Sequence, residues 1–203
     1  MSSRAESVLP AFLGGRVCLD FANTVGWRTS EAPLERLPDY AALLGWSERR
    51  RTLSRAAVRR LRLLAASDPL AAEEVGRQAR DLRREISRAA EDLMERRPVN
   101  LSEFNRRLAT LPRQPGTIRQ RDTYLHDLGG NALEEPLWPV LWSLTALLTS
   151  DDAQRVGCCG AQGCGWFFVD ESPNRSRLWC SSETCGNRER VRRAYARRRA
   201  RNE

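Results

Sequence analysis

Five of the six cysteines in this 203-residue chain lie within one stretch of 28 residues. Four of them form two pairs with equal spacing, because four residues separate Cys159 from Cys164 and four separate Cys180 from Cys185. Fifteen residues lie between the pairs. Two such pairs with a short insert are typical of a zinc site, in which four thiolates surround the ion as a tetrahedron. Four sulfur ligands leave no position open for water, so we expect one zinc ion per chain with a structural role.

The fifth cysteine of this stretch, Cys158, directly precedes the first predicted ligand. We choose Cys159 as the ligand by symmetry with the second pair, because adjacent residues rarely both turn inward to one ion. Cys158 is then a spare thiol that packs against its neighbours or takes part in redox chemistry. Cys18 lies far from the cluster on an apolar stretch, which predicts a buried small side chain.

The insert between the cysteine pairs predicts a hairpin. Residues 166–169 (WFFV) form its first strand, residues 171–174 (ESPN) its turn and residues 177–179 (RLW) its return strand. The three large aromatic residues of this segment, Trp166, Phe168 and Trp179, supply a small core. A module of about 45 residues buries too little apolar surface to fold alone, so we expect bound metal to provide much of its stability.

A basic helix is expected after Cys185. Ten arginines lie between Asn174 and Glu203 against three glutamates, although the whole chain has a net charge of only +8 and no lysine. Arginine forks suit phosphates and base edges, so such a helix can lie along a DNA backbone or enter a major groove. The candidate nucleic-acid contacts are Arg175, Arg177, Arg188, Arg192, Arg193 and Arg197. The alternatives are a solvated basic helix without a partner and, for residues 174–177, a turn stabilised by its own hydrogen bonds.

The residues before the cysteine cluster predict mainly helices. Short start signals and apolar periodicity place helices at residues 40–45 after Asp39, 53–66, 69–97 after Asp68, 102–111 with Ser102 as cap, and 137–149. The segment 117–128 predicts a strand or hairpin, and 17–21 predicts a strand or a buried helical turn.

Other classes of function have weaker support in the sequence. No run approaches the roughly 18 to 20 apolar residues of a membrane span, and the first residues lack an apolar signal core, so we expect a cytoplasmic protein without a membrane partner. The single histidine, His126, has no catalytic partners nearby in the sequence, so we do not expect an enzyme. Asp20, Asn23 and Thr24 are candidates for a ligand pocket; alternatively, they satisfy backbone groups at the end of an element.

The motif CGNR at residues 185–188, preceded by WFFVDESPNRSRLWCSSETC, closely resembles the CGNR-type zinc finger over roughly residues 157–200. Upstream, GGRVCLDFANTV and the helices after it resemble the ABATE domain that usually accompanies this finger. The resemblance implies a bacterial stress-related transcription regulator. The order of a hairpin followed by a helix predicts a treble-clef finger, with a zinc ribbon as the second choice. The resemblance implies that the four cysteines are zinc ligands. It also implies that five further residues belong to the family motif: Asn174, Arg175, Arg177, Asn187 and Arg188.

Together these observations predict an α+β protein. Residues 1–152 form a mainly helical domain with a small β-hairpin, which senses a small-molecule effector or forms homo-oligomers. Residues 153–203 form a treble-clef-like four-cysteine zinc finger that ends in a basic helix. The predicted function is transcription regulation through DNA binding. The alternative is a zinc-dependent RNA-binding or protein-interaction module.

Overall fold

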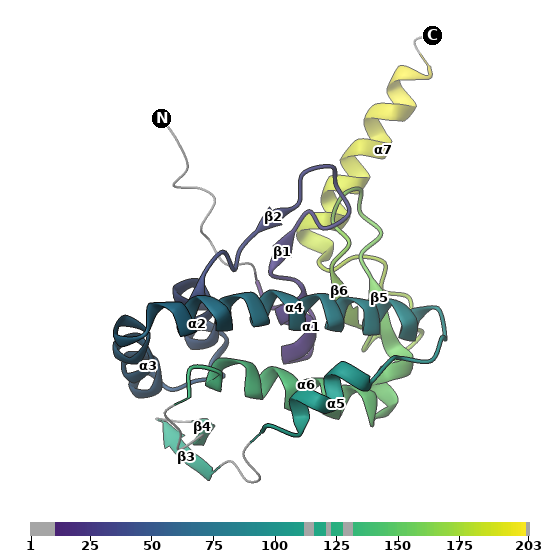
Figure 1. Ribbon diagram of the computed structural model, residues 1–203. Helices are drawn as coiled ribbons and strands as arrows, with labels where there is room; N and C mark the ends of the chain where they lie inside the picture. Colours follow the sequence, from purple (N-terminus) through teal and green to yellow (C-terminus); the bar gives the residue numbers. More distant parts are fainter. Residues whose placement is uncertain (1–10, 112–115, 121–122, 128–131, 202–203) are drawn as a thin grey trace, which may run out of the picture.

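The computed structural model describes residues 11–111, 116–120, 123–127 and 132–201. The fold is α+β and mainly helical (Figure 1). The helices are α1 (Val17–Ala22), α2 (Tyr40–Arg50), α3 (Arg55–Ser67), α4 (Pro69–Met94), α5 (Ser102–Leu108), α6 (Trp138–Leu148) and α7 (Asn187–Arg199). Three antiparallel two-stranded pairs join β1 (Val25–Gly26) to β2 (Leu34–Glu35), β3 (Gly116–Gln120) to β4 (Thr123–Asp127), and β5 (Val156–Cys158) to β6 (Phe167–Val169).

The helices of the first domain begin where side chains can cap them. The Asp39 carboxylate accepts a hydrogen bond from the amide of Ala42 at the start of α2, and Asp68 accepts one from Ala71 at the start of α4. Pro69 occupies the first turn of α4, where its missing N–H costs nothing. These caps confirm the start signals predicted from the sequence.

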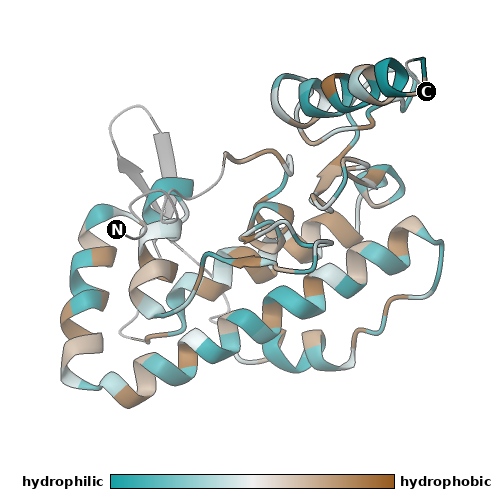
Figure 2. Cartoon of the chain, turned by 90° about the horizontal axis from the view of Figure 1, so that it is seen from above, coloured by the Kyte–Doolittle hydropathy of each residue, from teal (hydrophilic) through white to brown (hydrophobic). Residues whose placement is uncertain are grey.

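The core of the first domain is centred on α1, which packs against both α4 and α6 (Figure 1). The predicted apolar seam of α4 is confirmed, since Val75, Ala79, Leu82 and Ile86 are all buried. Figure 2 shows the same pattern as apolar patches on otherwise hydrophilic helices. The short helix α6 is buried on most of its surface, as its continuous apolar sequence predicts.

Some element boundaries differ from the sequence prediction. Helix α2 continues past Gly45 to Arg50, because the buried Trp46 packs edge-on against Phe21 with ring centroids 5.1 Å apart. That burial outweighs the roughly 1 kcal/mol helix penalty of one glycine. Ser102 is the first residue of α5 instead of its cap, since its amide donates to the Asn100 side chain.

The structure decides between the alternatives that the sequence left open for residues 17–21 and 117–128. Residues 17–21 are helical, and the predicted hairpin at 117–128 is present as β3 and β4. His126 lies on β4 opposite Thr117, but its side chain lies outside the described part of the structure. None of the described helices has the length and apolar character needed to cross a membrane.

The predicted hairpin within the zinc finger is wrong in its pairing. The strand β6 is present, but its antiparallel partner is β5, which precedes the first cysteine pair, with Val156 opposite Val169 and Cys158 opposite Phe167. The predicted return segment, residues 177–179, forms no strand. The turn between β5 and β6 therefore carries Cys159 and Cys164, and a helix follows the second pair, which is the arrangement of a treble clef.

Candidate metal centre

The four predicted ligands meet in a buried cluster. The Sγ atoms of Cys159, Cys164, Cys180 and Cys185 all lie within 4.8 Å of one another. The first pair comes from the turn between β5 and β6, which we name the knuckle loop (residues 159–165). In the second pair, Cys180 precedes the helical turn Ser182–Gly186 and Cys185 lies within that turn, just before α7. The cluster thus joins two segments that are not adjacent in the sequence.

The sulfur geometry fits a zinc ion. Sγ of Cys164 lies 3.8 Å from Sγ of Cys180, which in turn lies 3.5 Å from Sγ of Cys185. A tetrahedron with zinc–sulfur bonds of about 2.3 Å has sulfur–sulfur edges of about 3.8 Å. Because the four side chains are buried and offer only sulfur, they form one structural zinc site.

Protons are shared unequally within the cluster. Hydrogen bonds from the thiols of Cys164 and Cys180 lower the pKa of Cys159, and the bond to Cys159 raises the pKa of Cys164. The thiolate is the form of cysteine that binds zinc. Zinc binding by four thiolates therefore releases the protons that the thiols of the metal-free cluster hold.

The two remaining cysteines stand apart from the cluster. Cys158 is half-buried on β5 and packs against the main core. Burial raises the pKa of its thiol. Cys18 is fully buried, and burial raises the pKa of its thiol to about 11. Neither sulfur belongs to the four-sulfur cluster.

A small core supports the metal site. Phe168 is buried among the four cysteines, and the partly buried rings of Trp166 and Trp179 pack against the same cluster. This confirms the predicted role of these aromatic residues as a miniature core. The other face of β6 is different, because Phe167 and Val169 belong to the main core of the first domain. The finger therefore shares its strand pair with the domain before it.

The first domain also contacts the knuckle loop directly. The backbone amides of Arg28 and Thr29 donate to the carbonyl oxygens of Cys164 and Gly163, at 3.1 and 3.3 Å. The Arg28 side chain donates to the carbonyl of Gly165 at 2.8 Å. Gly165 has a φ of +65°, and a Cβ there would lie 2.5 Å from Cγ2 of Thr29, so this close approach requires glycine. In the sequence Arg28 is only a polar residue in a loop, so its contact with the knuckle loop could not be predicted.

One predicted nucleic-acid contact, Arg177, points into the finger. Its guanidinium lies 4.2 Å from the centre of the Phe168 ring. The same group donates to four backbone carbonyl oxygens, at Leu13, Val169, Trp179 and Cys180, over distances of 2.8 to 3.2 Å. These hydrogen bonds fix the position of residues 177–179, which do not form the strand pairing predicted for them. Arg175, in contrast, is exposed on that turn with a φ of 49°.

The other predicted arginines lie on α7. Arg188 stacks over the Trp27 ring at 4.4 Å, and Arg192 forms an ion pair with Glu189 at 2.7 Å. Arg193 and Arg197 lie farther along the helix and are exposed. Figures 1 and 2 show α7 as a largely hydrophilic helix that projects from the finger.

Glu189 fixes the first turn of α7 to the knuckle loop. This buried carboxylate accepts a hydrogen bond from the amide of Gln162 at 3.1 Å as well as the ion pair from Arg192. Hydrogen bonds from Arg192 and Gln162 lower the pKa of Glu189, so the carboxylate stays charged. The sequence showed Glu189 only as one acid within a basic run.

The candidate ligand-pocket residues are buried and bonded to the protein itself. Asp20 accepts hydrogen bonds from the amide of Gly14 and the side chain of Arg50, each at 2.8 Å. Asn23 bonds to the backbone of Phe167 through both atoms of its amide. Thr24 donates to the carbonyl of Phe21 and accepts from Arg83. The three side chains thus satisfy backbone and arginine groups around α1, which was the alternative left open for them.

Comparison with protein families gives two matches. The ABATE family, described as "Putative stress-induced transcription regulator", matches residues 15–151. The CGNR zinc finger family matches residues 155–198. No curated protein matches the chain.

Proposed function

Since the chain belongs to the ABATE family and carries a CGNR zinc finger, we propose that it is a transcription regulator that binds DNA through α7. The observation that carries this proposal is the exposure of the helix. Every residue from Arg190 to Ala200 is exposed, whereas Cys185 and Gly186 just before the helix are buried against the finger. The zinc site thus holds one end of a cationic helix and leaves the rest available to a partner (Figure 1).

The dimensions and charge of α7 suit duplex DNA. A helix of 13 residues is about 20 Å long at about 1.5 Å per residue. The major groove, about 12 Å wide, admits such a helix. Arg193 and Arg197 on α7, with Arg175 on the turn after β6, are exposed and would contact phosphates or guanine edges. Arg177 is outside this surface, because its donors already bond to carbonyl oxygens of the finger.

Contacts at the first turn of α7 fix the direction in which the helix projects. Glu189 bonds to the knuckle loop, and Arg188 stacks on Trp27 of the first domain. A helix fixed at its base loses little conformational freedom on binding, so more of the contact energy appears as affinity. We propose that residues 1–152 form the regulatory domain, which senses an effector or dimerises, and that residues 153–203 form the DNA-binding domain. The description of the ABATE family supports a role of this regulation in a stress response.

Fluorescence anisotropy with a labelled duplex of random sequence, measured over a series of salt concentrations, tests the proposal. We expect binding that weakens steeply as salt rises, because the helix replaces counterions on the phosphates. A chain with its full zinc content and no duplex affinity at low salt would contradict it.

A second candidate function is recognition of single-stranded RNA. Tyr195 and Val191 on α7 are 69% and 48% exposed. An exposed tyrosine between arginines can stack on an unpaired base, which a duplex does not offer. Binding of a single-stranded RNA in preference to duplex DNA of equal length would favour this function over the first.

A further inference from the structure

A cleft of about 430 Å³ lies on the first domain between α4 and the ribbon of β1 and β2. This volume is within the range of about 300 to 1,000 Å³ that small-molecule sites occupy. Four arginines and two glutamates line the cleft, which gives it a net charge of +2; they are Arg28, Arg83, Arg84, Arg88, Glu35 and Glu91. An excess of positive charge in a concave site favours an anionic ligand.

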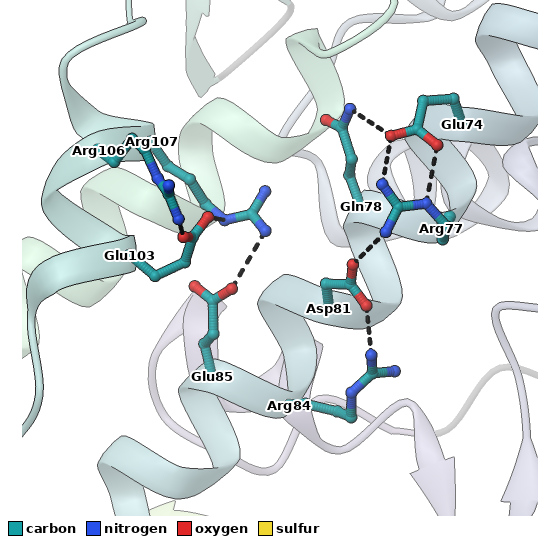
Figure 3. Close-up of polar contacts among 9 residues, drawn as sticks. All are labelled: Glu74, Arg77, Gln78, Asp81, Arg84, Glu85, Glu103, Arg106 and Arg107. Carbon is teal, nitrogen blue, oxygen red and sulfur yellow. Dashed lines mark hydrogen bonds and ion pairs between the residues drawn. The ribbon is translucent and has the colours of Figure 1, made fainter.

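The arginines of the cleft differ in how much of their charge is neutralised. Arg83 is buried and bonds to both carboxylate oxygens of Glu35, so it is fully engaged. Arg28 forms an ion pair with Glu91 at 2.8 Å. Arg84 is exposed and pairs with Asp81 at the edge of the ion-pair network on α4 and α5 (Figure 3).

Arg88 is the arginine that remains available. It is exposed on α4, and among the described residues it has no hydrogen-bond or ion-pair partner. It lies one turn after Arg84 on the same face of the helix. Two like charges at this spacing repel each other, and an anion between them would remove that repulsion.

We propose that this cleft binds a small phosphate-bearing molecule between Arg84 and Arg88. A phosphate carries about −1.5 to −2 charges at pH 7, whereas a carboxylate carries one, so a positively charged cleft attracts a phosphate more strongly. The arginine forks can donate to its oxygens in pairs. Val25 and Pro33 also line the cleft and offer apolar surface to the organic part of the ligand.

The site is connected to the finger through Arg28. The guanidinium of Arg28 bonds at once to Glu91 of the cleft and to the carbonyl of Gly165 in the knuckle loop. It also lies 4.1 Å from the centre of the Phe167 ring. The cleft and the contact that holds the knuckle loop to the first domain therefore share one residue, Arg28.

Isothermal titration calorimetry on the full-length, zinc-loaded chain tests the proposal, with phenyl phosphate, inorganic phosphate and benzoate as probes. We expect phenyl phosphate to bind at one site per chain and more tightly than the other two. Arg88→Gln should weaken this binding about tenfold, because a charge-assisted hydrogen bond is lost. The matched control is Arg59→Gln, which removes an exposed arginine of α3 outside the cleft.

Three results would overturn the proposal: no saturable binding, equal weakening by Arg88→Gln and Arg59→Gln, or benzoate binding as tightly as phenyl phosphate. The titration contains no DNA, so its outcome is independent of whether α7 binds a duplex. Circular dichroism of both variants checks that the fold is retained.

Discussion

The side-chain amide of Asn23 pairs with the backbone of Phe167, 144 residues later in the chain. Its Nδ2 donates to the Phe167 carbonyl and its Oδ1 accepts from the Phe167 amide, each at 2.8 Å. One side chain thus exchanges both hydrogen bonds with β6, as a residue of a neighbouring antiparallel strand would. This buried pair fixes the end of α1 to the zinc finger.

Replacement of Asn23 by alanine should destabilise the whole chain. It leaves the N–H and C=O of Phe167 buried without partners, and each unsatisfied group costs about 1–3 kcal/mol. We expect the free energy of unfolding in urea to fall by about 2–4 kcal/mol. Asn105→Ala, on the exposed surface of α5, is the control and should change it by less than about 0.5 kcal/mol. Equal effects of the two variants would refute the structural role of Asn23.

The zinc site predicts different results for adjacent cysteines. Cys159→Ser removes one of four clustered sulfur atoms, whereas Cys158→Ser changes a thiol outside the cluster. Mass spectrometry of metal content after dialysis should find about one zinc per chain in the wild type and in Cys158→Ser, and far less in Cys159→Ser. The reverse pattern would show that Cys158 is the ligand.

Substitution by lysine should affect stability differently at the two arginines of the NRSR segment (residues 174–177). In Arg177→Lys a single ammonium replaces a planar group that donates to four carbonyl oxygens, so we expect a loss of about 2 kcal/mol or more in unfolding free energy. Arg175→Lys keeps the charge at an exposed position and should change it by less than about 0.5 kcal/mol. Thermal and urea unfolding measure both, and equal stability of the two variants would contradict the inward role of Arg177.

Acid should weaken the ion pair between Arg83 and Glu35. Burial acts to raise the pKa of Glu35, but hydrogen bonds from Arg83 and the amide of Leu37 outweigh it and lower that pKa below its ordinary value of 4.5. The folded chain therefore holds this proton less tightly than the unfolded chain. The stabilisation is present above pH 4.5 and is lost as the pH falls through the lower folded pKa.

Glu35→Gln tests this dependence. The variant should lose stability at neutral pH and show a flatter decline below pH 4.5 than the wild type, as measured by urea unfolding across a pH series. Glu73→Gln, which changes an exposed carboxylate on α4, should reproduce the wild-type profile. An unchanged acid profile in Glu35→Gln would show that another group controls this range.

Local signals in the sequence predicted most of the helices and the metal ligands. Caps such as Asp68, the seam of α4 and the equal spacing of the cysteine pairs act over a few residues, so a single sequence reveals them. The extension of α2 past Gly45 was not predictable in this way, because it depends on the packing of Trp46 against Phe21.

Long-range pairing accounts for the other differences. The strand β5 has only three residues, and nothing in its sequence identifies β6 as its partner in preference to residues 177–179. The inward position of Arg177 and the contact of Asn23 with Phe167 depend on that pairing. Each looks like an ordinary polar residue until the fold brings its partner close.

The salt dependence of DNA binding should identify the arginines of α7 that contact phosphates. Arg197 is exposed near the end of α7 and, within the described residues, has no bonded partner, so its replacement by glutamine leaves the fold intact. If Arg197 neutralises one phosphate, the slope of the logarithm of affinity against the logarithm of salt concentration should decrease by about 0.9 in Arg197→Gln.

Arg59→Gln is the matched control for this measurement, because it removes the same charge from an exposed position on α3 in the first domain. It should leave the slope unchanged. A similar decrease in both variants would mean that the net charge of the chain, and not a contact made by α7, governs the affinity. A decrease confined to Arg197→Gln, with the zinc content unchanged, would assign that phosphate contact to the helix that the metal site holds.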